Sequence, residues 1–276
     1  MLLRKAIFSD LPEIKSLWKA VFLDSDDYIH SFISHFGVEA GYVCEINNAV
    51  AAMAFALPTA LSYHPHLSII NYQLPIIYVY ACATHPQYRR QGIMEKLLKT
   101  VYDDACCENI AGIFLQAADA NLMSYYRKLE FEDFFYEGET IFFLNYKGHK
   151  ENTKGAMEFI APDVYYTERE QRLEKLCFVN WGNDFFRFLS ETGQKFCMYE
   201  DAIFSFRAKD KTIIVDELLG NVPALQIASL LFERFPDFES IEIRTVGNDR
   251  CCGQIKWGKL PCSTLSNGYF AFAMES

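Results

Sequence analysis

The N-terminal part of the chain alternates short apolar runs with stretches in which apolar residues recur every three or four positions. The second spacing is typical of amphipathic helices and predicts helices at residues 11–22, 28–36, 93–105 and 119–129. The short apolar and β-branched runs predict strands at residues 3–8, 41–46, 49–57, 76–82, 113–117 and 140–146. Asp10 and Glu13 have the spacing of a capping box, and Asn47-Asn48 predicts a hairpin turn. We expect residues 58–75 to form a long loop.

A polar segment, residues 147–155, interrupts this pattern and is predicted to be a linker. Beyond it, the spacing predicts helices at residues 163–181, 183–190 and 222–235. Strands are predicted at residues 196–199, 202–208, 212–218, 240–245 and 269–274. Both parts follow the order helices, three strands, helix, strand, which is a repeat of architecture and not of residues. The sequence therefore predicts an α/β fold with mixed sheets (α+β), in two domains at residues 1–147 and 156–276.

The composition is that of a folded protein with enough apolar material for two cores, because 51% of the 276 residues are hydrophobic and 22% are charged. The longest apolar stretches, residues 49–57 and 76–83, are far shorter than the ~20 residues that a membrane-spanning helix needs. The net charge is −10, and no basic run is longer than Arg89-Arg90. We therefore expect no membrane and no nucleic-acid partner. The acidic balance favours a cationic small molecule or a peptide amine.

The cysteines and histidines give no sign of a metal site or of a disulfide framework. Nine cysteines occur without a C-x-x-C pair, so neither a zinc ribbon nor a thioredoxin-type motif is present. This usage predicts reduced thiols and a cytoplasmic location. His64 and His66 have no carboxylate or cysteine placed beside them, so no metal is expected there. Cys82 lies in an apolar strand, where burial raises the pKa of a thiol. No His or Asp is placed to act as its partner, so we do not expect Cys82 to be a nucleophile.

The most informative stretch runs from Tyr80 to Met94, where a strand ends and a helix begins at a basic turn. The N-terminus of a helix carries unpaired N–H groups and a partial positive charge, so it binds phosphate. Gly92 lets the backbone approach an anion closely, and Arg89 and Arg90 add charge-assisted hydrogen bonds. The arginine pair alone would fit a solvated helix start, but together with Gly92 at a strand–helix junction it favours phosphate binding.

This stretch resembles the acyl-CoA-binding motif of the GCN5-related N-acetyltransferases (the GNAT superfamily), written Q/R-x-x-G-x-G/A. Arg89, Gly92 and Met94 hold the three motif positions, the last of which is usually Gly or Ala. The R-R-x-G turn is also similar to that of the "enhanced intracellular survival" branch, in which a degenerate second copy follows the acetyltransferase domain. The resemblance implies two tandem GNAT-like domains, the second degenerate, and acetyl-CoA as co-substrate. It places acetyl-CoA on Cys82, Ala83, Thr84, Arg89, Arg90, Gln91, Gly92, Ile93, Met94 and Asn121.

A second segment, residues 121–131, looks like a family motif in which an asparagine is followed by a tyrosine and then by Gly-Phe. Tyr126 corresponds to the tyrosine that protonates the departing CoA thiolate, with Tyr125 as the alternative if the helix register differs. Glu130 stands where the family has glycine. The resemblance covers residues 1–147 well and residues 156–276 only by architecture. We expect the second domain to form a wall of the acceptor site.

The implied reaction is direct transfer of an acetyl group from acetyl-CoA to a primary amine in a ternary complex. Deprotonating a Lys-like amine of pKa ~10.4 at neutral pH costs roughly 4–5 kcal/mol, so a base is expected. In the resembled branch a chain-terminal carboxylate reaches the active site, and we hypothesise that the Ser276 carboxylate does so here. Glu45, Asp26 and Glu217 are further candidates for the base.

Two alternatives remain open at this point. The rival function is a non-catalytic CoA-binding or acyl-CoA-sensing module, which the departures at Met94 and Glu130 support. The acidic residues Asp24, Asp26 and Asp27 fit a solvated loop better than an acceptor entrance that attracts a cation. The resembled branch also implies self-association into a homo-oligomer.

Overall fold

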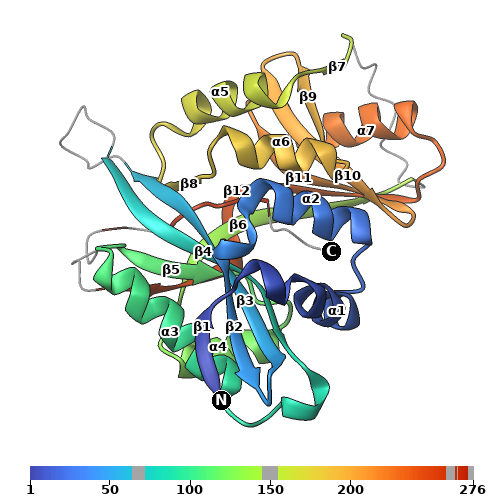
Figure 1. Ribbon diagram of the computed structural model, residues 1–276. Coiled ribbons are helices and arrows are strands. Elements are labelled where there is room, and N and C mark those ends of the chain that lie inside the picture. Colours follow the sequence, from blue (N-terminus) through green and yellow to red (C-terminus); the bar gives the residue numbers. More distant parts are fainter. Residues whose placement is uncertain (64–71, 145–154, 259–264, 266, 273–276) are drawn as a thin grey trace.

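The computed structural model describes residues 1–63, 72–144, 155–258, 265 and 267–272 (Figure 1). Within these residues one mixed sheet of 12 strands runs through the molecule in the order β1-β2-β3-β4-β5-β12-β11-β10-β9-β7. Strand β6 pairs with β12, and β8 pairs with β3. The predicted α/β fold with mixed pairing is confirmed. Below, the first half means the described residues up to 144, and the second half means those from 155 onward.

The first half follows the predicted order of elements. Its strands are β1 (Leu2–Lys5), β2 (Gly41–Ile46), β3 (Ala49–Tyr63), β4 (Tyr72–Thr84), β5 (Gly112–Leu115) and β6 (Glu132–Phe143). Its helices are α1 (Leu11–Phe22), α2 (Asp26–Phe36), α3 (Ile93–Cys107) and α4 (Ala120–Lys128), with short 3₁₀ turns at Phe8–Asp10, Val38–Ala40 and Pro86–Tyr88. The predicted hairpin turn is confirmed, because Asn47 and Asn48 both have positive φ, at 54° and 61°.

Several local predictions in the first half are wrong. The strand predicted at residues 3–8 ends at Lys5, and the strand predicted at residues 140–146 begins at Glu132. Residues 58–63 and 72–75 extend β3 and β4 where a loop was expected, and Pro58 lies opposite Ile77. The extension gains a partner that local sequence does not reveal, because β8 pairs with β3 near Ala60. The capping box at α1 is absent as well. Asp10 instead accepts hydrogen bonds from Arg4, at 2.6 and 2.9 Å.

The second half contains β7 (Glu158–Phe159), α5 (Pro162–Leu173), β8 (Phe178–Asn180), α6 (Asn183–Glu191), β9 (Lys195–Tyr199), β10 (Ala202–Lys209), β11 (Thr212–Leu219), α7 (Ala224–Arg234) and β12 (Ser240–Trp257). The helix predicted at residues 163–181 therefore ends early, and β8 follows it. The strand predicted at residues 240–245 continues to Trp257. In place of the strand predicted at residues 269–274, Tyr269 makes an isolated bridge with Phe178, and residues 273–276 lie outside the described residues.

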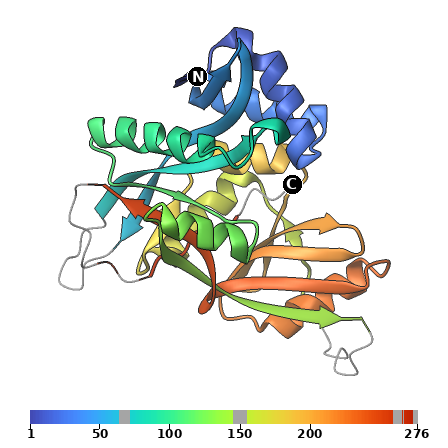
Figure 2. The same cartoon turned by 90° about the horizontal axis from the view of Figure 1, so that it is seen from below.

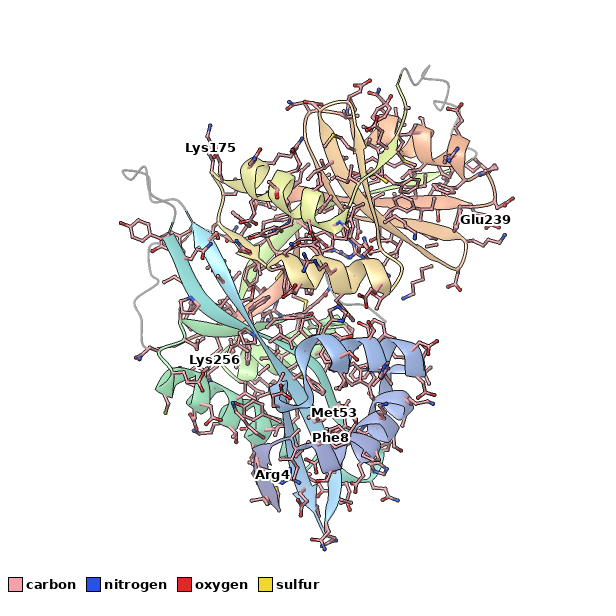
Figure 3. All side chains as sticks on the ribbon, turned by 45° about the horizontal axis from the view of Figure 1, so that its top comes forward. Arg4, Phe8, Met53, Lys175, Glu239 and Lys256 are labelled. Atoms are coloured by element: carbon pink, nitrogen blue, oxygen red, sulfur yellow. The ribbon has the colours of Figure 1, made fainter. Side chains whose placement is uncertain are left out.

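Strand β12 joins the two halves. Its first part runs parallel to β11, and its last four residues, 254–257, run antiparallel to β5. Strand β6 lies antiparallel along both parts, and Figure 2 shows the two strands side by side between the halves. Near the end of β12, Lys256 lies against first-half elements, where its Nζ donates to the Leu129 carbonyl at 3.0 Å (Figure 3). The split into domains at residues 1–147 and 156–276 stays a prediction, and the described strands connect the two segments through one sheet.

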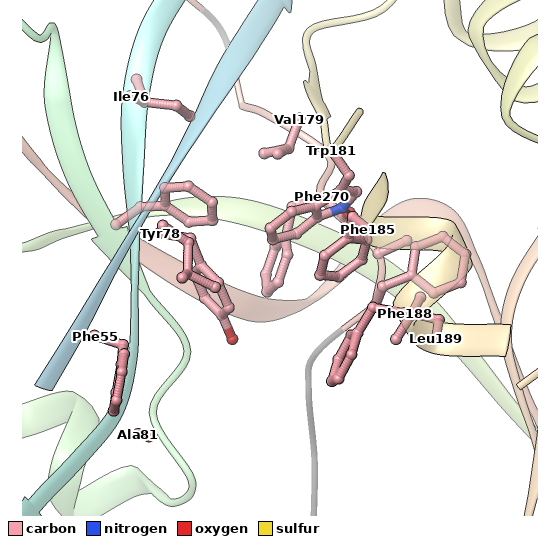
Figure 4. Packing of buried hydrophobic residues seen from close by; sticks show 14 of the residues in the cluster. Phe55, Ile76, Tyr78, Ala81, Val179, Trp181, Phe185, Phe188, Leu189 and Phe270 are labelled. Carbon is pink, nitrogen blue, oxygen red and sulfur yellow. The ribbon is translucent and has the colours of Figure 1, made fainter. Parts of the chain in front are cut away.

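An aromatic layer packs the halves together. The rings of Trp181 and Phe185 stack with centroids 4.4 Å apart, and Tyr78 of β4 meets Trp181 edge-on at 5.2 Å (Figure 4). The Trp181 Nε1–H donates to the Phe270 carbonyl at 2.8 Å, which ties the last described residues to the same layer. Because such rings bury large areas with fixed geometry, this layer holds β4 in a defined position relative to the second half.

Candidate active site

The site begins where β4 and β5 separate. The two strands run parallel and pair only from Ile76 to Tyr78 on β4 and from Gly112 to Phe114 on β5. Beyond these pairs a cavity of about 610 Å³ opens, which we call the shared cavity. Both halves line it, through Phe22, Tyr78, Val79, Tyr80, Ala81, Cys82, Leu115, Gln116, Ala117, Ala118, Asp119, Ala120, Leu122, Met123, Tyr126, Lys209, Arg250, Cys251 and Cys252.

A bulge in β4 shapes one wall of the shared cavity. The register between β3 and β4 shifts between Met53 and Phe55, so that Ala81 and Cys82 together oppose Ala54. Ala81 has φ of 51°, a left-handed conformation that is costly for a residue with a Cβ. A bulge leaves ladder groups unpaired, and such groups at a cavity wall can bind a ligand's carbonyl oxygen. Strained backbone of this kind concentrates at functional sites.

The predicted phosphate turn lies at the start of α3. Gly92 is the N-cap residue of this helix, with φ of 69° and ψ of 17°. A Cβ at this position would meet nothing closer than the Glu95 carboxylate at 3.9 Å, so the space in front of the turn is open. Among the described residues, no backbone carbonyl accepts a hydrogen bond from the amides of Gln91, Gly92 or Ile93. These amides and the partial positive charge of the helix N-terminus fit an anion.

The side chains around the turn divide into two groups. Arg89, Arg90 and Gln91 are exposed, and the Arg89 Nε–H donates to the Thr84 carbonyl at the end of β4, at 3.1 Å. Ile93 is buried, and Met94 packs against the apolar cluster that α3 forms with β4 and β5. The larger residue at the third motif position is therefore partly buried against this cluster.

The predicted acid, Tyr126, lines the shared cavity and is 6% exposed. Cys82 of β4 lines the same cavity. Burial raises the pKa of Tyr126 well above its usual value of 10, so the hydroxyl keeps its proton at neutral pH. Tyr125, the alternative, is half-buried and does not line the cavity. Asn121 is exposed on α4, while its neighbours Ala120 and Leu122 line the cavity.

None of the described carboxylates that were predicted as the catalytic base lines this cavity. The Glu45 carboxylate lies 2.8 Å from Arg4, and the Asp26 carboxylate lies 2.7 Å from Lys19. Glu217 is fully buried and accepts hydrogen bonds from Arg169 at 3.0 Å and from the Tyr165 hydroxyl at 2.8 Å. Each of these carboxylates has a structural partner instead. Ser276 lies outside the described residues, so its role stays a hypothesis.

Sequence reasoning undervalued Asp24. The Trp18 Nε1–H donates to its carboxylate at 2.7 Å, and partial burial raises the pKa of Asp24 above its usual value of 3.8. The carboxylate acts electrostatically on Tyr28 and Tyr80, whose hydroxyls lie 3.0 Å apart. Tyr80 lines the shared cavity, and its ring centroid lies 5.8 Å from that of Trp18, which donates to Asp24. The local signal was an aspartate six residues after a helical Trp, which alone does not distinguish a buried carboxylate from a solvated one.

The second half contributes two cations that the sequence did not single out. Lys209 comes from β10 and Arg250 from β12, and both line the shared cavity. Arg250 forms ion pairs with Glu137 and Glu139 of β6, the latter at 2.8 Å. The pairing of β12 with β6 brings Arg250 to the cavity, and the pairing of β10 with β11 and of β11 with β12 brings Lys209, so no local pattern marks either residue.

Neither a membrane segment nor a metal cluster is found in the part of the chain that the structure describes. No described helix combines the length and apolar character needed to cross a membrane. No group of three or more His, Cys, Asp or Glu side chains in the described ranges has the arrangement of a metal site.

A known family model matches part of the sequence, and solved structures match the architecture. The family model described as an acetyltransferase (GNAT) domain matches residues 3–134. No curated protein sequence matches the chain significantly. A GCN5-related N-acetyltransferase from Kribbella flavida superimposes with a TM-score of 0.66 at 14% identity, over 93% of this chain and 69% of that chain. Eis1 from Mycobacterium abscessus gives a TM-score of 0.61 at 13% identity, over 88% and 65% of the two chains.

A tandem GNAT protein from the clavulanic acid biosynthesis pathway also superimposes, with a TM-score of 0.57 at 10% identity. The overlap covers 93% of this chain and 98% of that chain, so the second half is part of the likeness. At these identities the structures show a shared fold alone, while the family model also matches the sequence. The strand separation, the β4 bulge and the turn at Gly92 all fall within the matched residues. Residues 3–134 thus match the acetyltransferase domain of the GNAT superfamily, whose members are generally acyl-CoA-dependent acyltransferases.

Proposed function

We propose that the protein is an N-acetyltransferase that moves an acetyl group from acetyl-CoA to a primary amine by direct attack in a ternary complex. The observation that carries the proposal is the shared cavity, which joins the bulged wall of β4 to Tyr126 and opens toward the second half. A donor and an acceptor can therefore meet in one space beside a proton donor. Such proximity supplies a large part of the rate enhancement in group transfer.

The residues of the turn and of β4 fit acetyl-CoA. The free amides at Gly92 and the exposed Arg89 and Arg90 suit its pyrophosphate. The pantetheine arm would lie in the opening between β4 and β5, where strand pairing has ended. The backbone N–H groups that the bulge leaves unpaired at Ala81 and Cys82 would donate hydrogen bonds to the thioester oxygen as it gains negative charge.

The chemical step then needs one base and one acid. A base, for which the Ser276 carboxylate stays the hypothesis, first takes a proton from the ammonium form of the amine. The neutral amine attacks the thioester carbon, its nitrogen loses a second proton to solvent, and the C–S bond of the resulting tetrahedral intermediate breaks with its electron pair on sulfur. Tyr126 gives its proton to that sulfur. A CoA thiol has a pKa near ~8.5, so at neutral pH the thiolate accepts a proton readily.

The two departures from the family pattern do not disturb this site. Glu130 has φ of 69°, the left-handed conformation for which glycine is favoured, and its carboxylate lies 2.8 Å from the Lys256 Nζ. The ion pair offsets part of the strain in the turn after α4. Met94 is partly buried against the apolar cluster that includes residues of α3 and β4. These contacts weaken the argument for a non-catalytic sensing module.

The experiment measures acetyl-CoA binding by calorimetry and free-thiol release with an amine panel that includes a polyamine, a lipid-like amine and a peptide N-terminus. We expect binding and amine-dependent thiol release from the wild type. Tyr126→Phe should keep the affinity for acetyl-CoA and slow transfer by about 10²-fold, which is typical for loss of a general acid. Tyr125→Phe is the matched control and should be nearly as active as the wild type.

The outcomes separate the alternatives. Binding without thiol release for any amine identifies a sensing module. Absence of binding overturns the acetyltransferase proposal as well. Equal rates for the wild type and Tyr126→Phe would show that another group protonates the thiolate.

A further inference from the structure

The hydroxyl groups of Tyr28 and Tyr80 lie 3.0 Å apart, which is hydrogen-bond distance. Tyr28 belongs to α2, and Tyr80 is the residue of β4 directly before the bulge at Ala81 and Cys82. Tyr80 lines the shared cavity, and both tyrosines are partly buried. A hydroxyl group therefore neighbours the part of β4 to which we assign the thioester, and the proton transfer from Tyr126 does not use it.

Aromatic packing fixes the position of this hydroxyl pair. The Tyr80 ring centroid lies 5.8 Å from that of Trp18. Phe22 packs on Trp18 as well, at 6.2 Å, and also lines the shared cavity. On the other side of the pair, the Tyr28 ring meets Phe188 of α6 edge-on at 5.7 Å. Because the contacts come from α1 and from α6, both halves hold the pair in place.

The hydroxyl pair is uncharged at neutral pH. Burial raises the pKa of Tyr28 and of Tyr80 above the usual value of 10, so both keep their protons. A hydroxyl has one donor and two acceptor lone pairs, so Tyr80 can donate to Tyr28 and still accept a hydrogen bond from the cavity. An attacking amine needs such an acceptor, because its lone pair must stay free for the thioester carbon while its N–H groups need partners.

We propose that Tyr80 binds the acceptor amine: its hydroxyl oxygen accepts a hydrogen bond from an amine N–H while its own proton goes to the oxygen of Tyr28, a positioning residue. This inference rests on the proposed function. The hydrogen bond directs the nitrogen lone pair toward the thioester carbon. It strengthens as the nitrogen gains positive charge during the attack, so it stabilises the transition state more than the bound substrate. Tyr80 keeps its proton and forms no covalent bond, and the proton that the nitrogen loses goes to solvent.

The test compares Tyr80→Phe with the wild type in the thiol-release assay. Phenylalanine keeps the ring and its packing and removes only the hydroxyl. The kcat/KM for the amine should fall about tenfold, as expected for one hydrogen bond to a nitrogen that gains charge. The affinity for acetyl-CoA, measured by calorimetry, should stay within about twofold, because the hydroxyl makes no contact with the donor.

Two further variants make the result specific. Tyr28→Phe leaves the Tyr80 hydroxyl in place without its partner, so kcat/KM for the amine should fall about threefold, and in a Tyr80→Phe background it should cause no further loss. Tyr102→Phe is the matched control, since its hydroxyl donates to the Trp257 carbonyl at 3.0 Å and does not line the shared cavity. It should leave kcat/KM unchanged. Thermal unfolding of each variant reports whether the fold is intact.

A Tyr80→Phe variant with the wild-type kcat/KM for the amine overturns the inference while the acetyltransferase proposal stands. A loss of acetyl-CoA affinity in that variant also overturns it, because the hydroxyl would then serve the donor. Additive losses in the double variant would show that Tyr28 acts independently of Tyr80 and overturn its positioning role. A wild type that binds acetyl-CoA but releases no thiol with any amine overturns the proposed function itself, and this role with it.

Discussion

At the scale of single residues, the strongest constraint lies in the backbone of Gly92. We expect Gly92→Ala to reduce stability by about 1 kcal/mol, because its φ of 69° is unfavourable for a residue with a Cβ. The added methyl would also stand at the free amides, so affinity for CoA should fall about tenfold. Urea unfolding and calorimetry measure the two effects separately.

Gly193→Ala is the matched control, since Gly193 also has a positive φ of 109° and nothing within 4 Å of an added Cβ. It should lose stability but bind CoA normally. Equal CoA affinity for the wild type and Gly92→Ala would remove the turn from the binding site.

The ion pair at the start of α1 gives a pH-dependent prediction. Hydrogen bonds from Arg4 hold the pKa of Asp10 below its usual 3.8. Its contribution to stability is therefore complete above pH ~4 and is lost as the pH falls through the lowered pKa. Asp10→Asn should be less stable than the wild type by about 1–2 kcal/mol at neutral pH, with the difference shrinking below pH ~3. Urea unfolding across this range measures it, and a constant difference would contradict the assignment.

Residue-level signals predicted some features of the backbone well. Asn47-Asn48 and Gly92 adopt the positive φ that their chemistry favours. The left-handed Ala81 was not predictable, because alanine gives no local reason for a bulge. Asp24 was misjudged for a related reason: its burial depends on Trp18 and on neighbours from other elements.

At the scale of elements, a buried ion pair holds α5 on the sheet. Arg169 is fully buried and donates to Glu217 of β11 and to the Val179 carbonyl of β8, each at 3.0 Å. We expect Arg169→Leu to lower the free energy of unfolding by about 3–5 kcal/mol, because it leaves a buried carboxylate without its cation. Adding Glu217→Gln should recover part of the loss, because glutamine still accepts from the Tyr165 hydroxyl and carries no charge. Urea unfolding of the single and double variants measures this, and a simple sum of losses would show that charge is not the cause.

Element types followed from the hydrophobic pattern, but several element lengths did not. The periodicity of α3 and the β-branched run of β4 are local properties, and both predictions are confirmed. The extended β3, the short β8 and the second part of β12 exist because each finds a partner far away in the chain. The residues of each element alone do not reveal such long-range pairings.

At the scale of the whole molecule, β12 makes each half depend on the other. In its last residues β12 fills the place between β5 and β6, so residues 1–147 alone would expose the paired edge of β5. We expect this segment to be insoluble or unfolded when produced alone, and the full chain to unfold in one transition. Circular dichroism of both proteins during heating measures this. A folded, soluble segment with CoA affinity would show that the predicted domain is independent.

The same strand has a consequence for biosynthesis. Among the described strands, β12 is the last to leave the ribosome, although it occupies a central place in the finished sheet. Until it emerges, the growing polypeptide carries apolar strands whose neighbour has not been synthesised, a state prone to aggregation. Stalling translation before residue 240 should yield nascent chains that bind chaperones and are digested rapidly by protease, whereas chains released after residue 257 should resist digestion.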